Sequence, residues 1–416
     1  MNILKFFTAG SVDDGKSTLI GRLLYDTDSI LTDQLEALQT SSRKNDDGSI
    51  DLAILTDGLR AEREQGITID VAYKYFQTEK RKFIIADTPG HIQYTRNMVT
   101  GASTANLAII LIDARNGVAE QTIRHSYLVS LLGIKHVVLC INKMDMVDYS
   151  EEIYNDIISN YKGLAKKLHL EDVNYIPVSA LKGDNVVQNS INMPWYKGES
   201  LLHFLETVDT DHLENSKLAR MPVQWVIRPQ TEDLHDYRGY AGRIISGTFS
   251  VGDAITILPS GVTSAVKKID FFEKDLKEAK AGQSVVIHLK DNIDISRGDT
   301  IVNSAALPQD SKQIEADICW MDTKPLDASL MYTLQHNSKK TRCKIGEIVH
   351  KVDINTLDKH SAEDFKLNDI GRVILKTAEV LPFDLYEDNR ANGSAILIDD
   401  RTNLTVAALM FRNAFS

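Results

Sequence analysis

Residues 10–17 read Gly10-Ser11-Val12-Asp13-Asp14-Gly15-Lys16-Ser17, which matches the phosphate-binding pattern G-x-x-x-x-G-K-S. Backbone N–H groups of such a loop converge on phosphate oxygens, and the helix that follows points its positive end at the same place. Gly10 and Gly15 supply the backbone freedom that the turn requires. Lys16 offers a positive charge to the β- and γ-phosphates, and Ser17 offers a hydroxyl to Mg²⁺. This stretch predicts a nucleoside triphosphate site near the start of the chain.

Three further nucleotide motifs follow in the expected order: Asp87-Thr88-Pro89-Gly90, Asn142-Lys143-Met144-Asp145 and Ser179-Ala180-Leu181. Asp87 ends an apolar stretch and is expected to hold Mg²⁺ through water. Gly90 is expected to present its N–H to the γ-phosphate, in a segment that is ordered by that phosphate and released when it leaves. His91 follows directly. A lone histidine is usually a surface residue, but this position favours a role in orienting the attacking water. Lys16, Gly90 and His91 are therefore the predicted catalytic residues.

The motif at residues 142–145 predicts which base is bound. The Asp145 carboxylate can accept hydrogen bonds from N1 and N2 of guanine, and adenine has no such pair of donors. A polar site built for such bonds rejects the wrong ligand by factors of up to roughly 10⁴–10⁵. Lys143 can lie over the ring, and Ala180 can offer its N–H to the guanine carbonyl. The sequence thus predicts GTP over ATP, and the residues expected to bind it are Gly10, Ser11, Val12, Asp13, Asp14, Gly15, Lys16, Ser17, Thr18, Asp87, Thr88, Pro89, Gly90, His91, Asn142, Lys143, Asp145, Ser179, Ala180 and Leu181.

Two features of this predicted site have more than one interpretation. Asp13 and Asp14 would repel a triphosphate if they pointed inward, so we expect them to point outward into solvent, or to contact Mg²⁺-bound water or a partner. Thr68 lies between the first two motifs, where a threonine suits the second protein ligand of Mg²⁺. Spacing alone does not distinguish such a ligand from an ordinary surface residue.

Composition limits the class of protein. The chain has 416 residues, which suggests two or three domains. Its 47 basic and 58 acidic residues give a net charge of −11, which disfavours broad binding to nucleic acid or to an acidic membrane. The three cysteines, Cys140, Cys319 and Cys343, are far apart and odd in number, as is typical of buried thiols in a reducing compartment. No apolar run reaches membrane-spanning length and no signal peptide is evident, so we expect a cytoplasmic protein.

The pattern of apolar runs predicts the architecture. Short apolar runs at residues 4–9, 83–86, 107–112, 136–141 and 175–178 alternate with helix-like stretches such as 17–25 and 151–168. This alternation predicts a mainly parallel sheet with helices on both faces, and four of the five runs end directly at a nucleotide motif, where such sheets bind ligands. From Val223 onward, short strands punctuated by glycine predict an antiparallel barrel or sandwich, and a second similar stretch begins at Lys312. We therefore expect an α/β GTPase domain over residues 1–215 followed by two antiparallel β domains over 221–305 and 312–416.

These motifs resemble the translational GTPases of the elongation factor Tu type, in which a GTPase domain precedes two β-barrels, so the resemblance implies that both antiparallel domains are β-barrels. Asp87-Thr88-Pro89-Gly90-His91 is similar to the second-switch signature of that superfamily. Arg238-Gly239-Tyr240-Ala241-Gly242-Arg243, followed by Gly247 and Val251-Gly252-Asp253, is similar to its second domain. The phosphate loop departs from the usual Val-Asp-His-Gly-Lys of elongation factors, because residue 14 is an aspartate.

Other segments resemble the large, GTP-hydrolysing subunit of the bacterial heterodimeric sulfate adenylyltransferase. The similarity spans nearly the whole chain and is carried by Leu55–Asp70, Gln93–Met98, Ser179–Val187 with Met193–Tyr196, Ile293–Asp299 and Asp388–Arg390. The residues around Thr68 favour its role as a metal ligand, so the expected Mg²⁺ ligands are Ser17, Thr68 and Asp87. One departure is Ile92, where the family usually has a glutamate, and this could change the rate of hydrolysis.

The resemblance implies a function. The family makes adenosine 5′-phosphosulfate and pyrophosphate from ATP and sulfate, an uphill transfer that GTP hydrolysis drives. The adenylyl-transfer site belongs to a smaller catalytic subunit, so the implied partner is that subunit, in a heterodimer or a higher assembly, and neither nucleic acid nor membrane. The implied cofactors are GTP and Mg²⁺. A second phosphate loop is absent from the sequence, so we expect no adenylylsulfate kinase activity.

Two rival functions remain open from the sequence. The first is a translation factor that delivers aminoacyl-tRNA, against which the acidic charge, Asp14 and the region of Asp70 all count. The second is a nucleotide-gated scaffold that binds GTP but barely hydrolyses it because of Ile92. Binding of aminoacyl-tRNA on filters separates the first rival from the implied function, and single-turnover GTP hydrolysis with and without the partner separates the second.

The base assignment gives a first prediction. Asp145→Asn is expected to weaken GTP binding and to favour xanthosine triphosphate, because the amide can donate to the carbonyl that replaces the guanine amino group. Titration of the variant with both nucleotides measures the exchange of preference. GTP affinity equal to that of the unmodified chain would refute the assignment of Asp145.

Overall fold

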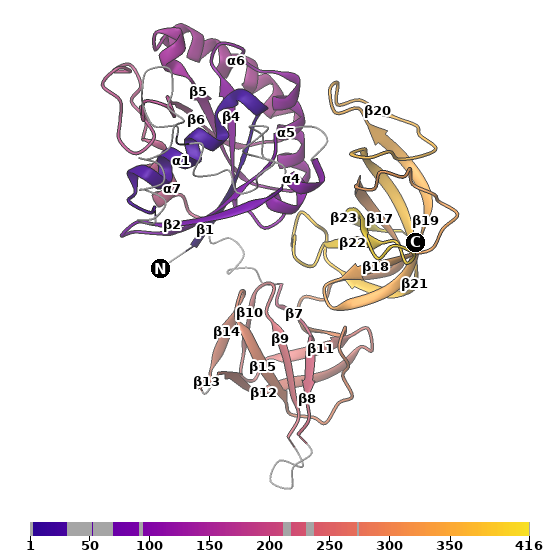
Figure 1. Cartoon of the computed structure of the whole chain (residues 1–416). Coiled ribbons are helices and arrows are strands. Elements are labelled where there is room, and N and C mark those ends of the chain that lie inside the picture. Colours follow the sequence, from indigo (N-terminus) through magenta and orange to yellow (C-terminus); the bar gives the residue numbers. More distant parts are fainter. Residues whose placement is uncertain are drawn as a thin grey trace. The chain divides into compact units, whose positions relative to one another are not determined.

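The structure, a computed structural model, describes residues 3–30, 52, 70–90, 95–210, 218–229, 237–272 and 274–415. The chain folds into two compact units, Met1–Thr210 and Asp211–Ser416 (Figure 1). Each unit has buried apolar cores of its own. Those of the second unit include one within each of its two barrel sheets.

The described part of the first unit contains a six-stranded sheet with the order β2-β3-β1-β4-β5-β6. Its strands are β1 (Ile3–Ala9), β2 (Ala72–Gln77), β3 (Lys82–Asp87), β4 (Leu107–Asp113), β5 (His136–Asn142) and β6 (Asp172–Pro177). All neighbours pair in parallel except β2, an edge strand that runs antiparallel to β3. Every residue of β4 is buried, as expected for a central strand that helices cover on both faces. The sequence reasoning placed the five parallel strands and missed β2.

Helices pack on both faces of this sheet. They are α1 (Lys16–Asp26), α4 (Thr95–Ala102), α5 (Glu120–Leu131), α6 (Glu151–Lys167) and α7 (Leu201–Thr207). Leucines of α1 and α7 enter one core with Phe6 and Phe83 of the sheet, and Figure 1 shows α4, α5 and α6 on the opposite side. Ser150 and Ser200 cap α6 and α7 by accepting hydrogen bonds from the backbone N–H groups of Ile153 and His203.

The second unit is built from antiparallel strands. They are β7 (Arg220–Pro222), β8 (Trp225–Ile227), β9 (Gly239–Arg243), β10 (Thr248–Ser250), β11 (Ala254–Leu258), β12 (Val262–Phe271), β13 (Lys274–Leu276), β14 (Glu278–Lys280), β15 (Ser284–Leu289), β16 (Thr300–Asn303), β17 (Gln309–Trp320), β18 (Tyr332–His336), β19 (Lys339–Val352), β20 (Lys359–His360), β21 (Ile370–Phe383), β22 (Ser394–Ile398) and β23 (Thr405–Ala414). β7 to β16 surround one core, and β18-β22-β23-β17-β21-β19 closes into a barrel because β19 also pairs with β18. The predicted fold class, an α/β GTPase domain followed by antiparallel barrels, is confirmed.

A buried ion pair joins the two barrel sheets of the second unit. Arg220, on β7, is fully buried and forms two hydrogen bonds with Asp384, just after β21, at 3.0 and 2.9 Å. Asn389 and Asn392 donate to the same carboxylate at 2.9 and 3.0 Å, and Asn389 also donates to Ser246 of the first barrel at 2.9 Å. Asp388–Arg390 was singled out in the sequence without a role, and its middle residue belongs to this junction.

The junction generates a stability prediction. Asp384→Asn keeps the shape of the side chain but removes the charge that faces Arg220. The free energy of unfolding of the barrel unit is expected to fall by about 3–5 kcal/mol, since a buried guanidinium loses its counter-charge. Chemical denaturation followed by tryptophan fluorescence measures the loss.

Glu379→Gln is the matched control. Its carboxylate is 57% exposed and pairs with Lys339 at 2.6 Å, so the expected change is below about 1 kcal/mol. Changes of equal size in the two variants would contradict the importance of the buried pair.

Candidate nucleotide-binding site

The four sequence motifs lie together beyond the carboxyl ends of the strands in the first unit's sheet. β1 pairs with β3 on one side and with β4 on the other, so the chain leaves β1 at the point where the strand order reverses. Open α/β sheets bind their ligands at such a point, beyond the carboxyl ends of the strands. The strand register brings the tips level, because Thr8 pairs with Asp87 and Asp113 pairs with Asn142.

The phosphate loop needs both of its glycines. Gly15 has φ +90°, and a Cβ atom on it would lie 2.5 Å from the amide nitrogen of Asn142. Gly10 has φ +151°, and a Cβ atom there would lie 3.0 Å from the carbonyl oxygen of Leu111 on β4. The loop therefore runs against the tips of β4 and β5, which no residue with a side chain could do at these positions.

Lys16 is held inside this loop. Its ammonium group donates to the carbonyl oxygens of Gly10 and Ser11 at 3.0 and 2.8 Å, and the residue is 4% exposed. Burial lowers the pKa of Lys16, while the nearby carboxylates of Asp87, Asp14 and Asp13 raise it in part. A buried cation fixed by two carbonyls is well placed to meet an anion that arrives at the loop.

One of the two loop carboxylates differs from expectation. Asp13 is exposed, as predicted, but the outward orientation predicted for Asp14 is wrong, because this residue is only 7% exposed. The Asp14 carboxylate accepts a hydrogen bond from the Ser11 N–H at 2.5 Å and so braces the loop from within. Burial raises the pKa of Asp14, and the Ser11 N–H and Lys16 act in the opposite direction. A sequence pattern of acidic residues could not separate the two, since only the turn decides which one folds back.

The Asp87–Gly90 segment lies beside the same loop. Asp87, at the end of β3, is buried and accepts a hydrogen bond from the Thr8 hydroxyl at 3.4 Å. The Thr88 hydroxyl donates to the Thr8 carbonyl at 2.6 Å, which fastens the two strand tips together. A Cβ atom on Gly90 would lie 2.4 Å from the Gly10 carbonyl oxygen and 2.6 Å from the Lys16 nitrogen. Gly90 thus has no room for a side chain at the predicted γ-phosphate position.

Asn142 connects the phosphate loop to the third and fourth motifs. Its side-chain nitrogen donates to the Asp14 carbonyl at 2.7 Å, and its side-chain oxygen accepts from the Ala180 N–H at 2.9 Å. The residue is 2% exposed, so water does not compete with these bonds. The sequence predicted that the Ala180 N–H can donate to the guanine carbonyl. In the structure this N–H already donates to Asn142, so a guanine would have to share it.

Lys143 is oriented by a carboxylate that the sequence reasoning did not single out. Asp113, at the tip of β4, accepts from the Lys143 ammonium at 3.0 Å and from the Arg115 guanidinium at 2.6 Å. Burial raises the pKa of Asp113, but its hydrogen bonds with Arg115 and Lys143 outweigh this and lower it to about 2. Asp113 is therefore ionised at neutral pH and holds the lysine that comes two residues before Asp145. Asp145 lies half-buried in the short turn η4 (Met144–Val147).

Two further residues support the base-side loops and were also missed. Arg22, on α1, donates to the carbonyl oxygens of Ala180 and Leu181 at 3.2 and 2.5 Å. Trp195 donates from its ring nitrogen to the carbonyl of Tyr149 at 3.0 Å, just beyond η4. Arg22 lies outside the sequence motifs, so only its contacts in the structure identify it.

The structure places two further predicted residues: Ser17 lies in the first turn of α1, and Ser179 is fully buried just after β6. The other predictions, for Thr68, His91 and Ile92, lie outside the described residues. No cluster of three or more acidic, histidine or cysteine side chains that could hold a metal occurs among the described residues. A hydroxyl and one carboxylate, as in Ser17 and Asp87, suit Mg²⁺ that is held mainly by phosphate and water.

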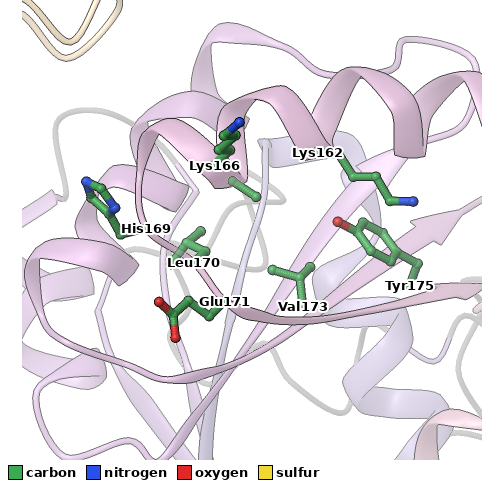
Figure 2. A pocket seen from close by; sticks show the side chains of 8 residues that line it. Lys162, Lys166, His169, Leu170, Glu171, Val173 and Tyr175 are labelled. Atoms are coloured by element: carbon green, nitrogen blue, oxygen red, sulfur yellow. The ribbon is translucent and has the colours of Figure 1, made fainter.

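A surface hollow of about 470 Å³ lies elsewhere, between α6 and β6 (Figure 2). Lys162 and Tyr175 lie at one end of it, with the Lys162 nitrogen 5.9 Å from the ring centre, and His169 and Glu171 lie toward the other end. None of the motif residues lines it. The candidate nucleotide site is therefore the group of motif residues at the strand tips, and this hollow is separate from it.

None of the helices in the described ranges is both long and apolar enough to span a membrane.

Comparisons with known proteins agree with this geometry. Residues 1–216 match the elongation factor Tu GTP binding domain, 240–302 match elongation factor Tu domain 2, and 313–412 match the GTP-eEF1A C-terminal domain-like family. Sulfate adenylyltransferase subunit 1 of Colwellia psychrerythraea is 51% identical, covering 99% of this chain and 88% of that protein. Proteins of the same name from Bacteroides fragilis and Aliarcobacter butzleri are 53% and 51% identical, covering 98% and 99% of this chain and 86% and 87% of theirs.

The Asn142 bridge generates a prediction. Asn142→Ala leaves the Asp14 carbonyl and the Ala180 N–H buried without a partner, and each such group costs about 1–3 kcal/mol. We expect weaker folding of the first unit and a fall in GTP affinity of more than about tenfold, because both sides of the site lose their connection. Thermal unfolding and titration with a fluorescent GTP analogue measure the two effects.

Asn189→Ala is the control. Asn189 is exposed and donates to the Gly198 carbonyl at 3.1 Å. Its removal is expected to change both quantities little. GTP affinity that survives Asn142→Ala unchanged would show that the two loops hold the nucleotide independently.

Proposed function

This chain belongs to the family of sulfate adenylyltransferase subunit 1 proteins, and from that premise we propose that its GTPase domain drives the formation of adenosine 5′-phosphosulfate. GTP and water become GDP and phosphate on this chain, while ATP and sulfate become adenosine 5′-phosphosulfate and pyrophosphate on a smaller catalytic subunit. The second reaction is uphill, so it must take its free energy from the first.

The proposal assigns roles to the residues at the strand tips. The loop from Gly10 to Ser17, with the buried Lys16 ammonium, binds the β- and γ-phosphates. Asp145 and Lys143 recognise guanine, supported by Asp113. Asn142 keeps these two halves at a fixed separation, because it is bonded to both loops. Because the two loops are connected in this way, we expect them to keep their relative position when the γ-phosphate leaves.

Magnesium, when bound, would neutralise charge on the transferred phosphoryl group. Ser17 and Asp87 are the proposed ligands from the described residues, and Thr68 is the proposed third. The buried position of Asp87 and its bond from Thr8 favour a carboxylate that stays in place rather than one that turns to solvent. His91 is proposed to orient the attacking water.

Energy coupling requires that the GTP and GDP forms differ in free energy toward the partner, since tight binding alone shifts no equilibrium. The segment at Gly90 is the proposed sensor. It lies against Gly10 and Lys16 without space for a side chain, so a phosphate there must change its contacts. We propose that this change, together with one at Thr68, alters the surface that the catalytic subunit meets.

The domain organisation and the cellular location of the chain are part of the proposal. We propose three domains, over residues 1–215, 221–305 and 312–416, of which the last two move together because Arg220 and Asp384 join them. We also propose a cytoplasmic location. Cys140, Cys319 and Cys343 are all buried and unpaired, which supports a reducing compartment.

One observation carries the proposal: relatives that share half of their residues with this chain over almost its whole length bear the name of one subunit of this enzyme. The name implies a second subunit. The test is to purify this chain together with the small catalytic subunit and measure adenosine 5′-phosphosulfate at equilibrium. We expect more product with GTP than with a non-hydrolysable analogue.

Lys16→Ala supplies the control for that experiment. It removes the buried ammonium, so GTP should no longer raise the yield in this variant, while synthesis without GTP should persist at its low equilibrium level. Equal product with GTP and with the analogue in the unmodified complex would overturn energy coupling.

A further inference from the structure

Among the described residues, helices cover only part of one face of the first unit's sheet. On the α4 side, Gly101 packs at the strand tips, where a Cβ atom on it would lie 2.8 Å from the Thr88 side chain and 3.1 Å from that of Val71. Farther from the strand tips, side chains on this face are exposed. Tyr73 is 44% exposed and Tyr75 is 67% exposed, although sheets of this class bury both faces.

The strand register shows which side chains share this open face. Tyr75 pairs with Ile84, which pairs with Lys5, and the next row holds Gln77, Lys82 and Ile3. Directly opposite residues point to the same side of a sheet, and side chains two residues apart on one strand do so too. We call Ile3, Lys5, Tyr73, Tyr75, Lys82 and Ile84 the β2 patch. On the opposite face of β2 and β3, the buried rings of Phe76 and Phe83 stack against each other.

The composition of the β2 patch is that of an interface rather than of ordinary surface. Ile3 is 46% exposed, so apolar groups from two strands lie open beside the tyrosines. Tyrosine is enriched at protein interfaces, and contiguous exposed apolar groups mark binding surfaces. In addition, no described strand pairs with the outer edge of β2, so its backbone groups are available to another chain.

Charge indicates what kind of partner fits. The β2 patch contains two lysines and no acidic residue, and no ion pair between described residues involves Lys5 or Lys82. The nearby Lys80 is different, because Glu206 already pairs with it at 2.7 Å. The whole chain has a net charge of −11 and would repel an acidic surface elsewhere. The patch therefore suits apolar side chains surrounded by carboxylates.

We infer that the β2 patch is a docking surface for the smaller catalytic subunit, which meets it with an acidic, apolar-centred segment. This inference rests on the proposed function, since it takes the existence of that subunit from it. The position suits regulation as well as binding. β2 begins at Ala72, four residues after Thr68, so a partner held on β2 is connected through a short stretch of backbone to the proposed metal ligand.

The test compares two double variants of the full chain. Tyr75→Thr with Lys82→Glu changes the β2 patch while keeping a strand-forming residue on the edge. Trp225→Thr with Lys344→Glu is the matched control, because Trp225 is also 67% exposed on a strand and Lys344 is an exposed strand lysine. Affinity for the purified catalytic subunit is measured by titration calorimetry at two salt concentrations, and GTP affinity is measured in parallel.

We expect the patch variant to bind the catalytic subunit at least about tenfold more weakly, as for loss of an interface tyrosine, and with a smaller dependence on salt. The control variant should bind as the unmodified chain does. GTP affinity should stay unchanged in both, which shows that neither is misfolded at the nucleotide site.

Three results would overturn the inference. The first is unchanged affinity of the patch variant when the unmodified chain binds the subunit. The second is an equal loss in the control variant. The third is a changed oligomeric state or a changed compactness of the isolated chain with intact partner binding, which would assign the patch to a second copy or to the chain's own barrels. Failure of the unmodified chain to bind the subunit at all would instead count against the proposed function.

Discussion

The side-chain amide of Asn142 is the interaction on which the nucleotide site depends. It donates to the phosphate loop through the Asp14 carbonyl and accepts from the Ala180 N–H of the base-side loop, in a position that water does not reach. Lys16, Asp87 and Gly90 lie on one side of this bridge, and Lys143 and Asp113 lie on the other. Because an unpaired buried amide is costly, the two halves keep one relative position.

Gly90 lies against Gly10 and Lys16 without space for a side chain. In the proposed mechanism, this is the segment whose contacts change when the γ-phosphate leaves. The second unit also depends on a buried polar contact, because the fully buried Arg220 pairs with Asp384 and connects the two barrel sheets.

Local patterns predicted much of this, and their failures have physical causes. Short apolar runs that end at a polar motif identified the five parallel strands, because a buried parallel strand must be continuously apolar. β2 was missed because Tyr73 and Tyr75 are exposed, so its pattern resembles a surface segment. Asp14 was expected to point outward, or to contact Mg²⁺-bound water or a partner, because an inward carboxylate would repel a triphosphate. In the structure the turn folds its carboxylate back onto the Ser11 N–H. Arg22 and Asp113 lie outside every motif, and only their contacts identify them.

The sequence by itself determined the nucleotide, the order of the domains and the family, since these depend on residue types at fixed spacing within short loops. The tertiary structure alone decided which side chains connect those loops, that Arg220 needs Asp384 across 164 positions of the chain, and which face of the sheet stays open. The reason is that hydrogen bonds and burial depend on distances in space, and for residues far apart along the chain those distances exist only after folding.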